Sequence, residues 1–153
     1  KGGFKERTTE MAEHLVLTAL EKAFQSLEDT VTALSDRAWF EQQDAVVQET
    51  LVAGAIQKFE FVYELGLKML RRQLAAEAVS PDEVQSADFR DLLRLGLQSG
   101  LIDNMDDWVF YRKMRNITSH TYDKDKAAEV YAAIGGFLSS SRVLLRGLQE
   151  RNR

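Results

Sequence analysis

The chain has 153 residues, of which 44% are hydrophobic and 29% charged, a composition typical of a single globular domain. It contains no cysteine, which excludes disulfides, thiolate metal sites and a cysteine nucleophile, and which suits a reducing cytoplasm. The formal net charge is −4, so a nucleic acid would have to bind at a local basic cluster rather than through overall charge. No apolar run approaches the roughly 20 residues that span a bilayer, and the first ten residues lack the apolar core of a signal peptide. We therefore expect one cytoplasmic domain over residues 1–153, without membrane association.

The first predicted helix begins near Leu17 and ends near Leu34. Its apolar residues follow one another at alternating steps of three and four: Leu17, Leu20, Phe24, Leu27, Val31 and Leu34. This spacing predicts one apolar stripe along a helix of about five turns. His14 flanks the stripe, and we interpret it as a surface or packing residue.

The second predicted helix runs from about Asp44 to about Ala78 and carries apolar residues on more than one side, which indicates a central position in the fold. Its polar face places two acids and two bases at successive steps of four: Glu60, Glu64, Lys68 and Arg72. Acids that precede bases at this spacing favour ion pairs along the helix. We interpret this ladder as an ion-paired surface.

Three further helices are predicted after residues 80–83, where Pro81 interrupts the helical pattern. The first covers about 89–100 and is followed by a turn and cap at 103–107. The second carries Trp108 to Arg115 and frays over 119–122. Asp123 is a suitable N-cap for the last helix, which continues beyond Leu148.

Gly135 and Gly136 interrupt the last helix, at a cost of about 1 kcal/mol each relative to alanine. We interpret the pair as a close packing contact, with a dimer interface as one option. No strand-like alternation competes with the helical spacing. The sequence thus predicts an all-α, up-and-down antiparallel bundle of about five helices.

The candidate chemistry lies between the last two helices, in residues 115–123. Arg115 offers a permanent charge and a planar set of donors for phosphate oxygens, and His120 titrates near neutrality and can move a proton. Asn116 and Ser119 could orient this pair, and Tyr122 adds a phenol. Such a cluster could bind a phosphodiester and stabilise its transition state without metal. On residue types and spacing alone, a helix cap with solvated side chains is the simpler interpretation.

Other kinds of site find little support in the sequence. Paired metal-ligand motifs on facing helices are absent, as is a glycine-rich phosphate loop in a strand–turn–helix setting. The serines at 139–141 have no histidine or lysine base placed to activate them. We expect no metal and no cofactor.

Three blocks of sequence resemble the nucleotidyltransferase substrate-binding protein family of the HEPN superfamily. They are FEFVYELGLK at 59–68, SPDEV at 80–84 leading to GLI at 100–102, and Trp108 followed by RNITSHTYD at 115–123. The last block matches the superfamily's Arg-x4-6-His signature in the form Arg-x4-His-x-Tyr. Together the blocks span about half of the chain.

The resemblance implies a HEPN-like helical bundle that forms a homodimer, with two motifs around one cleft. Active members are metal-independent endoribonucleases that serve as toxins. By resemblance, His120 would be the general acid/base for attack of the ribose 2′-hydroxyl on phosphorus, Arg115 would stabilise charge on the phosphate, and Asn116 would position one of them. Glu64, Lys68 and Ser119 are candidates for the wall of the cleft.

The resemblance also implies a partner, because members with this tyrosine are encoded beside a minimal nucleotidyltransferase antitoxin. That enzyme would adenylylate Tyr122, and the attached nucleotides would block the cleft. The alternative function is that of a non-catalytic substrate-binding subunit of a two-component nucleotidyltransferase, which is what the older family name describes. Since every motif residue is present, we favour the ribonuclease.

Overall fold

The computed structural model describes residues 14–153, so the opening segment in which no signal peptide is expected lies outside the described residues. The described part contains seven α-helices, one 3₁₀ helix (η1) and no strand. The helices are α2 (Thr18–Leu34), α3 (Arg37–Glu41), α4 (Ala45–Glu77), α5 (Pro81–Gln85), α6 (Phe89–Ser99), α7 (Met105–Ile117), η1 (Thr118–His120) and α8 (Lys124–Arg151).

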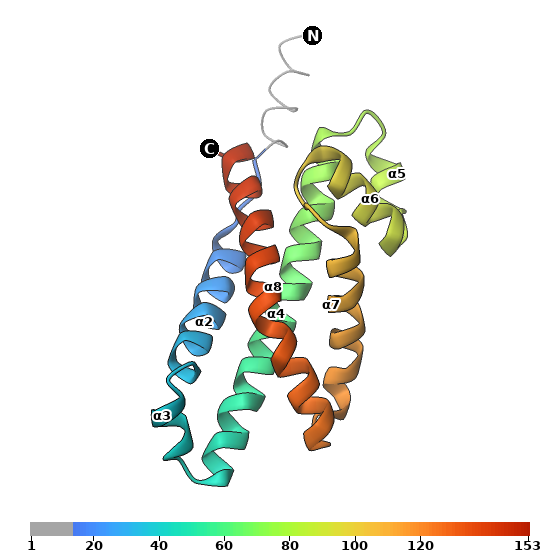
Figure 1. Ribbon diagram of the computed structural model, residues 1–153. Helices are drawn as coiled ribbons and strands as arrows, with labels where there is room; N and C mark the ends of the chain where they lie inside the picture. Colours follow the sequence, from blue (N-terminus) through green and yellow to red (C-terminus); the bar gives the residue numbers. More distant parts are fainter. Residues whose placement is uncertain (1–13) are drawn as a thin grey trace.

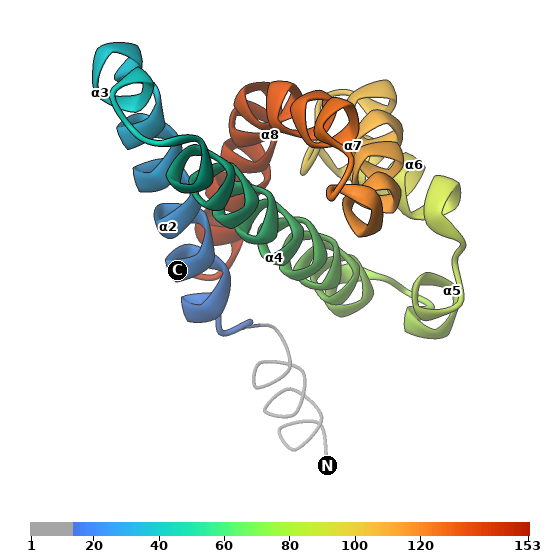
Figure 2. The ribbon, with the colours of Figure 1, turned by 90° about the horizontal axis from the view of Figure 1, so that it is seen from below.

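Four helices, α2, α4, α7 and α8, form the body of the molecule and alternate in direction (Figure 1). Helices α5 and α6 pack at one end, whereas α3 caps the other end beside the start of α4 (Figures 1 and 2). The predicted all-α antiparallel bundle is confirmed. The five predicted helices are all present, and α3 and α5 are two five-residue helices that the apolar spacing did not predict, because one turn is too short to show a period.

The helix starts follow from short polar side chains at their N-caps. Asp88, Asn104 and Asp123 each accept a hydrogen bond from a backbone N–H in the first turn of α6, α7 and α8 respectively. The predicted cap at Asp123 is therefore confirmed. At its other end α6 stops at Gly100, which has a φ of 80° that glycine adopts without strain.

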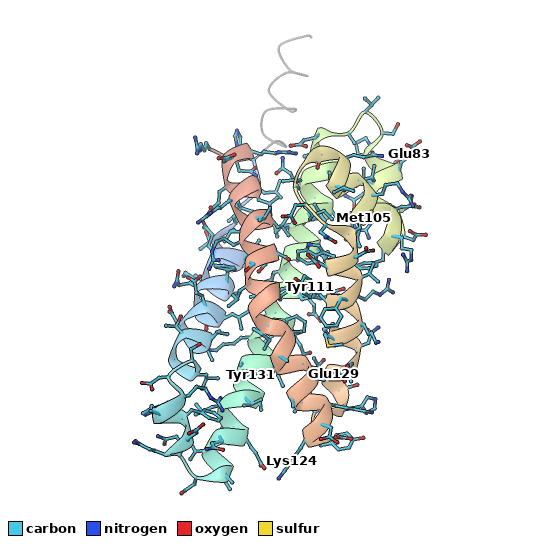
Figure 3. All side chains as sticks on the ribbon, viewed as in Figure 1. Glu83, Met105, Tyr111, Lys124, Glu129 and Tyr131 are labelled. Atoms are coloured by element: carbon cyan, nitrogen blue, oxygen red, sulfur yellow. The ribbon has the colours of Figure 1, made fainter. Side chains whose placement is uncertain are left out.

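The core between α4, α7 and α8 is aromatic. Phe137 meets Phe59 and Tyr111 edge to face, with ring centroids 4.7 and 5.1 Å apart, and Trp108 lies 5.8 Å from the same ring. The Tyr111 hydroxyl forms a buried 2.7 Å hydrogen bond with Ser140, and Figure 3 places Tyr111 between α7 and α8. This packing joins the middle of α7 to the middle of α8, and the candidate chemistry lies in the turn that connects these two helices.

The glycine pair of α8 is not required by packing inside the described part of the protomer. A Cβ at Gly135 would meet no atom within 4 Å, and one at Gly136 would lie 3.6 Å from the Tyr111 hydroxyl, an ordinary contact. The interpretation as a close contact within the protomer is therefore wrong, and an interface between copies stays a prediction. Among residues 14–153, no helix is both long and apolar enough to cross a bilayer.

Candidate functional site

The candidate site lies where α7 ends and α8 begins. Arg115 occupies the last turn of α7, and η1 continues directly from it and carries His120 at its end. Thr118 is buried and ties the two segments together, since its hydroxyl donates to the Arg115 carbonyl (2.7 Å). Thr121 donates in turn to the Thr118 carbonyl (3.1 Å). The turn that carries the motif is therefore ordered by its own side chains.

Arg115 is held by two acids of α4. Its Nη2 and Nε both donate to Oε1 of Glu64, at 2.6 and 3.1 Å, and its Nη1 lies 3.4 Å from a carboxylate oxygen of Glu60. The same Nη1 donates to the Thr118 hydroxyl (3.1 Å). The Glu64 hydrogen bonds raise the pKa of Arg115 above its usual value, so the guanidinium is charged at every physiological pH. A third of the side chain remains exposed.

His120 and Tyr122 face each other on the surface. The Nδ1 atom of His120 lies 3.3 Å from the Tyr122 hydroxyl, and the two rings meet nearly edge-on with centroids 6.0 Å apart. Tyr122 is 84% exposed, and His120 is also exposed. The structure thus brings the motif histidine and the motif tyrosine together, on the turn that follows the helix carrying Arg115.

The other predicted site residues are less engaged. Asn116 and Ser119 are exposed, and neither side chain makes a hydrogen bond within the described residues. Lys68 is exposed on α4, one turn beyond Glu64, and makes no ion pair with any described residue. Of the candidate wall residues, Glu64 alone contacts Arg115. His14 is exposed and precedes α2 rather than flanking its apolar stripe.

The predicted ion-paired ladder of α4 is wrong in its pairing. Within residues 14–153, Glu60 and Glu64 pair with Arg115 on α7, and neither Lys68 nor Arg72 pairs with them. An i,i+4 pair on an exposed helix is worth only a few tenths of a kcal/mol, so a guanidinium that reaches two carboxylates at once displaces it. The sequence interpretation missed the roles of Glu60 and Thr118. For Glu60 a signal was present in the sequence. Its spacing of four residues from Glu64 places both acids on the same face of α4, where a single arginine can reach both.

The four tyrosines differ sharply in accessibility. Tyr63 and Tyr111 are buried, and burial raises the pKa of Tyr63 to about 12. Tyr131 is half-buried, and burial raises its pKa above the usual value. Tyr122 is the only one of the four whose side chain is exposed.

The arrangement offers an anion-binding guanidinium, an imidazole that can exchange protons and an accessible phenol on one turn. These groups suit chemistry on a phosphodiester. No group of three or more histidines, aspartates or glutamates in the described part of the chain is arranged to hold a metal ion.

A helical bundle that carries an Arg-x4-His-x-Tyr motif at the end of α7 is typical of the HEPN superfamily. Comparison with known proteins identifies the family within it. Residues 15–150 match the family model described as "Nucleotidyltransferase substrate binding protein like", so the chain belongs to that family. The resemblance in the three sequence blocks is therefore confirmed.

Comparisons with a curated protein and with a solved structure, both from Haemophilus influenzae, extend this result. The chain is 56% identical over 142 residues to a protein named "Probable ribonuclease HepT", a match that covers 93% of this chain and 97% of the relative. It also resembles a solved structure, described as the fold of a substrate-binding domain of a nucleotidyltransferase, with a TM-score of 0.86 and 56% identity. That match covers 88% of this chain and 99% of the other.

Proposed function

We propose that this protein is a HEPN endoribonuclease that acts as the toxin of a toxin–antitoxin pair and cleaves RNA without metal. The observation that carries the proposal is the turn itself, where Arg115 is fixed by Glu64 and His120 and Tyr122 stand exposed beside each other. The 56% identity to a probable ribonuclease over nearly the whole chain supports the same activity.

In the proposed reaction, His120 takes the proton of a ribose 2′-hydroxyl, and the 2′-oxygen attacks the adjacent phosphorus. The bond from phosphorus to the 5′-oxygen breaks, and that oxygen receives a proton from the imidazolium of the second motif in a homodimer. The products are a 2′,3′-cyclic phosphate and a 5′-hydroxyl end. Arg115 stabilises the charge on the phosphorane, and Asn116 positions the reacting groups. Lys68 and Ser119 would line the cleft between the two copies of the motif in the homodimer.

Replacement of the histidine tests this activity. We expect His120→Ala to lose about a hundredfold or more in the rate of RNA cleavage measured in EDTA, because a general acid–base group typically contributes that much. His14→Ala is the matched control, since it removes the other exposed histidine of the chain. Undiminished cleavage by His120→Ala would contradict the mechanism.

We further propose that a minimal nucleotidyltransferase neutralises the toxin by adenylylating Tyr122. The Tyr122 oxygen attacks the α-phosphorus of ATP, the bond to pyrophosphate breaks, and the phenolic proton leaves to a base of that enzyme. The support is accessibility, because the other three tyrosine side chains are buried or half-buried. An AMP group beside His120 would block the turn and neutralise charge at Arg115.

Intact mass after co-expression with the nucleotidyltransferase tests the modification. We expect added AMP units that map to Tyr122, that disappear in Tyr122→Phe and that persist in Tyr131→Phe. An unchanged mass in the presence of active enzyme would argue against the antitoxin relationship.

A second function is favoured by one feature of the site. Two carboxylates already occupy Arg115, so its charge is partly neutralised before any phosphate arrives. This suits a non-catalytic subunit that presents substrate to a nucleotidyltransferase, and the solved relative is described as having the fold of a substrate-binding domain of such an enzyme. That function predicts a stable complex with the enzyme and no RNA cleavage by the free protein. If expression of the free protein arrests cell growth and the substitution Arg115→Ala abolishes that arrest, the result would favour the toxin.

A further inference from the structure

A groove of about 470 Å³ lies beside the candidate site, between α3, the first half of α4 and the first turns of α8. Its volume falls within the range of small-molecule sites. Neither Arg115 nor His120 lines it, whereas Thr121 and Tyr122 form one edge. Lys124 and Tyr131 both line the groove, and Figure 3 shows Lys124 at the start of α8 and Tyr131 further along the helix. Tyr122 is thus shared between the groove and the catalytic turn.

The walls of the groove combine aromatic surface with cations. Phe40 and Tyr131 are half-buried, and the guanidinium of Arg37 lies 5.2 Å from the centre of the Phe40 ring. Arg37 and Lys124 each pair with an exposed acid, Glu41 at 3.7 Å and Glu49 at 3.3 Å. Exposed pairs of this kind contribute little, so a phosphate can displace Glu41 from Arg37 and can displace Glu49, which also lines the groove, from Lys124. Aromatic rings beside cations are the features that bind a base and its phosphate.

Gln48 adds a hydrogen-bond acceptor to the groove. Its Nε2 donates to the carbonyls of Phe40 (3.0 Å) and Gln43 (3.1 Å), which fixes the corner between α3 and α4. Its Oε1 accepts no hydrogen bond from the described residues, and the side chain lines the groove. An exocyclic amino group such as that of adenine would satisfy this oxygen.

We propose that the groove is the docking site for the adenosine of an AMP group attached to Tyr122. The inference rests on the proposed adenylylation and adds where the nucleotide lies. The Tyr122 side chain is 84% exposed, so its rotation from His120 toward the groove is unhindered by packing. A tethered ligand has an effective concentration in the millimolar range, so weak contacts in the groove are enough to hold it. Arg37 and Lys124 would face the phosphate, and Phe40 and Tyr131 the base.

Resistance to a phosphodiesterase measures the docking. Protein adenylylated by co-expression, with the mass verified, would be treated with a phosphodiesterase that releases AMP from tyrosine. The enzyme can cleave only those molecules whose AMP group is out of the groove, so the rate of AMP release is proportional to the undocked fraction. An AMP group that is docked nine-tenths of the time is therefore released about tenfold more slowly than one that never docks. The variant is Ala53→Trp, which fills the groove from an exposed position of α4. The matched control is Ala19→Trp, an exposed position of α2 that does not line the groove.

We expect Ala53→Trp to release AMP about tenfold faster than the wild type, and Ala19→Trp to match the wild type. Arg37→Ala should act in the same direction as Ala53→Trp, with Arg90→Ala on α6 as its control. In the unmodified protein, saturation-transfer NMR should detect AMP alone bound to the wild type and not to Ala53→Trp. This second probe does not depend on the modification.

The outcomes separate failure of the inference from failure of the proposed function. Equal release rates in wild type and Ala53→Trp, with AMP present on Tyr122, would overturn the docking and leave the adenylylation standing. Absence of AMP on Tyr122 would overturn both. Loss of RNA cleavage by unmodified Ala53→Trp, with AMP release unchanged, would assign the groove to an RNA nucleotide instead. A change in the oligomeric state of Ala53→Trp would assign it to a second copy of the chain.

Discussion

At the scale of single residues, Glu64 has two opposing effects on the candidate site. Its carboxylate fixes the Arg115 side chain by two hydrogen bonds, which positions the guanidinium for a phosphate. The same carboxylate competes with that phosphate for the positive charge. Glu60 adds to the competition from 3.4 Å. Glu64 therefore acts through Arg115 as a positioning residue, and its replacement should separate binding from turnover.

We expect Glu64→Gln to lower the KM for RNA cleavage by about two- to fivefold, because an exposed ion pair of up to about 1 kcal/mol no longer opposes phosphate binding. The kcat should fall at the same time, since Arg115 loses a charge-assisted contact that orients it. Steady-state kinetics on one defined RNA measures both. Glu83→Gln, an exposed acid of α5, should change neither. A raised KM with unchanged kcat would be inconsistent with competition.

At the scale of helices, the sequence predicted the long elements well and their contacts less well. The period of apolar residues gave the bounds of α2 and α4 to within about one residue, since burial of one face imposes that period. Helices α3 and α5 have five residues each, and their formation depends on a local cap and on Pro81 at the first turn. The ion pairs of Glu60 and Glu64 with Arg115 depend on how closely α7 approaches α4. That distance cannot be predicted from the sequence of either helix alone.

The hydrogen bond between Tyr111 and Ser140 joins α7 to α8 and so supports the turn between them. We expect Tyr111→Phe to lower the free energy of unfolding by about 1–3 kcal/mol, because it leaves the buried Ser140 hydroxyl without this partner. The double variant Tyr111→Phe/Ser140→Ala should be more stable than the sum of the single changes implies, since both polar groups are then removed. Chemical denaturation measures each value. Strict additivity would show that the two hydroxyls act independently.

At the scale of the whole molecule, the candidate site could be predicted in part. Residue types and family resemblance identified Arg115, His120 and Tyr122 as the motif, and the structure shows His120 and Tyr122 within 3.3 Å. The groove could not be predicted, because its walls come from α3, α4 and α8, and α3 ends at Glu41 whereas α8 begins only at Lys124. Its aromatic residues are each a plausible core residue in sequence. Only the packing of the three segments brings them beside Tyr122.

The homodimer is the remaining expectation at this scale, and the glycines of α8 provide its test. Each glycine in a helix interior costs about 1 kcal/mol relative to alanine, and no described contact inside the protomer requires Gly135. An interface between copies, where backbones approach closely, would account for it. We expect Gly135→Arg to be monomeric by light scattering and to lose RNA cleavage, because a cleft with one motif lacks the second imidazole.

Gly54→Arg is the matched control, since a Cβ at this glycine of α4 also meets no atom within 4 Å. Its helical circular dichroism should match that of Gly135→Arg, and it should remain dimeric and active. A dimeric, active Gly135→Arg would exclude this face of α8 from the interface and leave the glycine pair without a role in assembly.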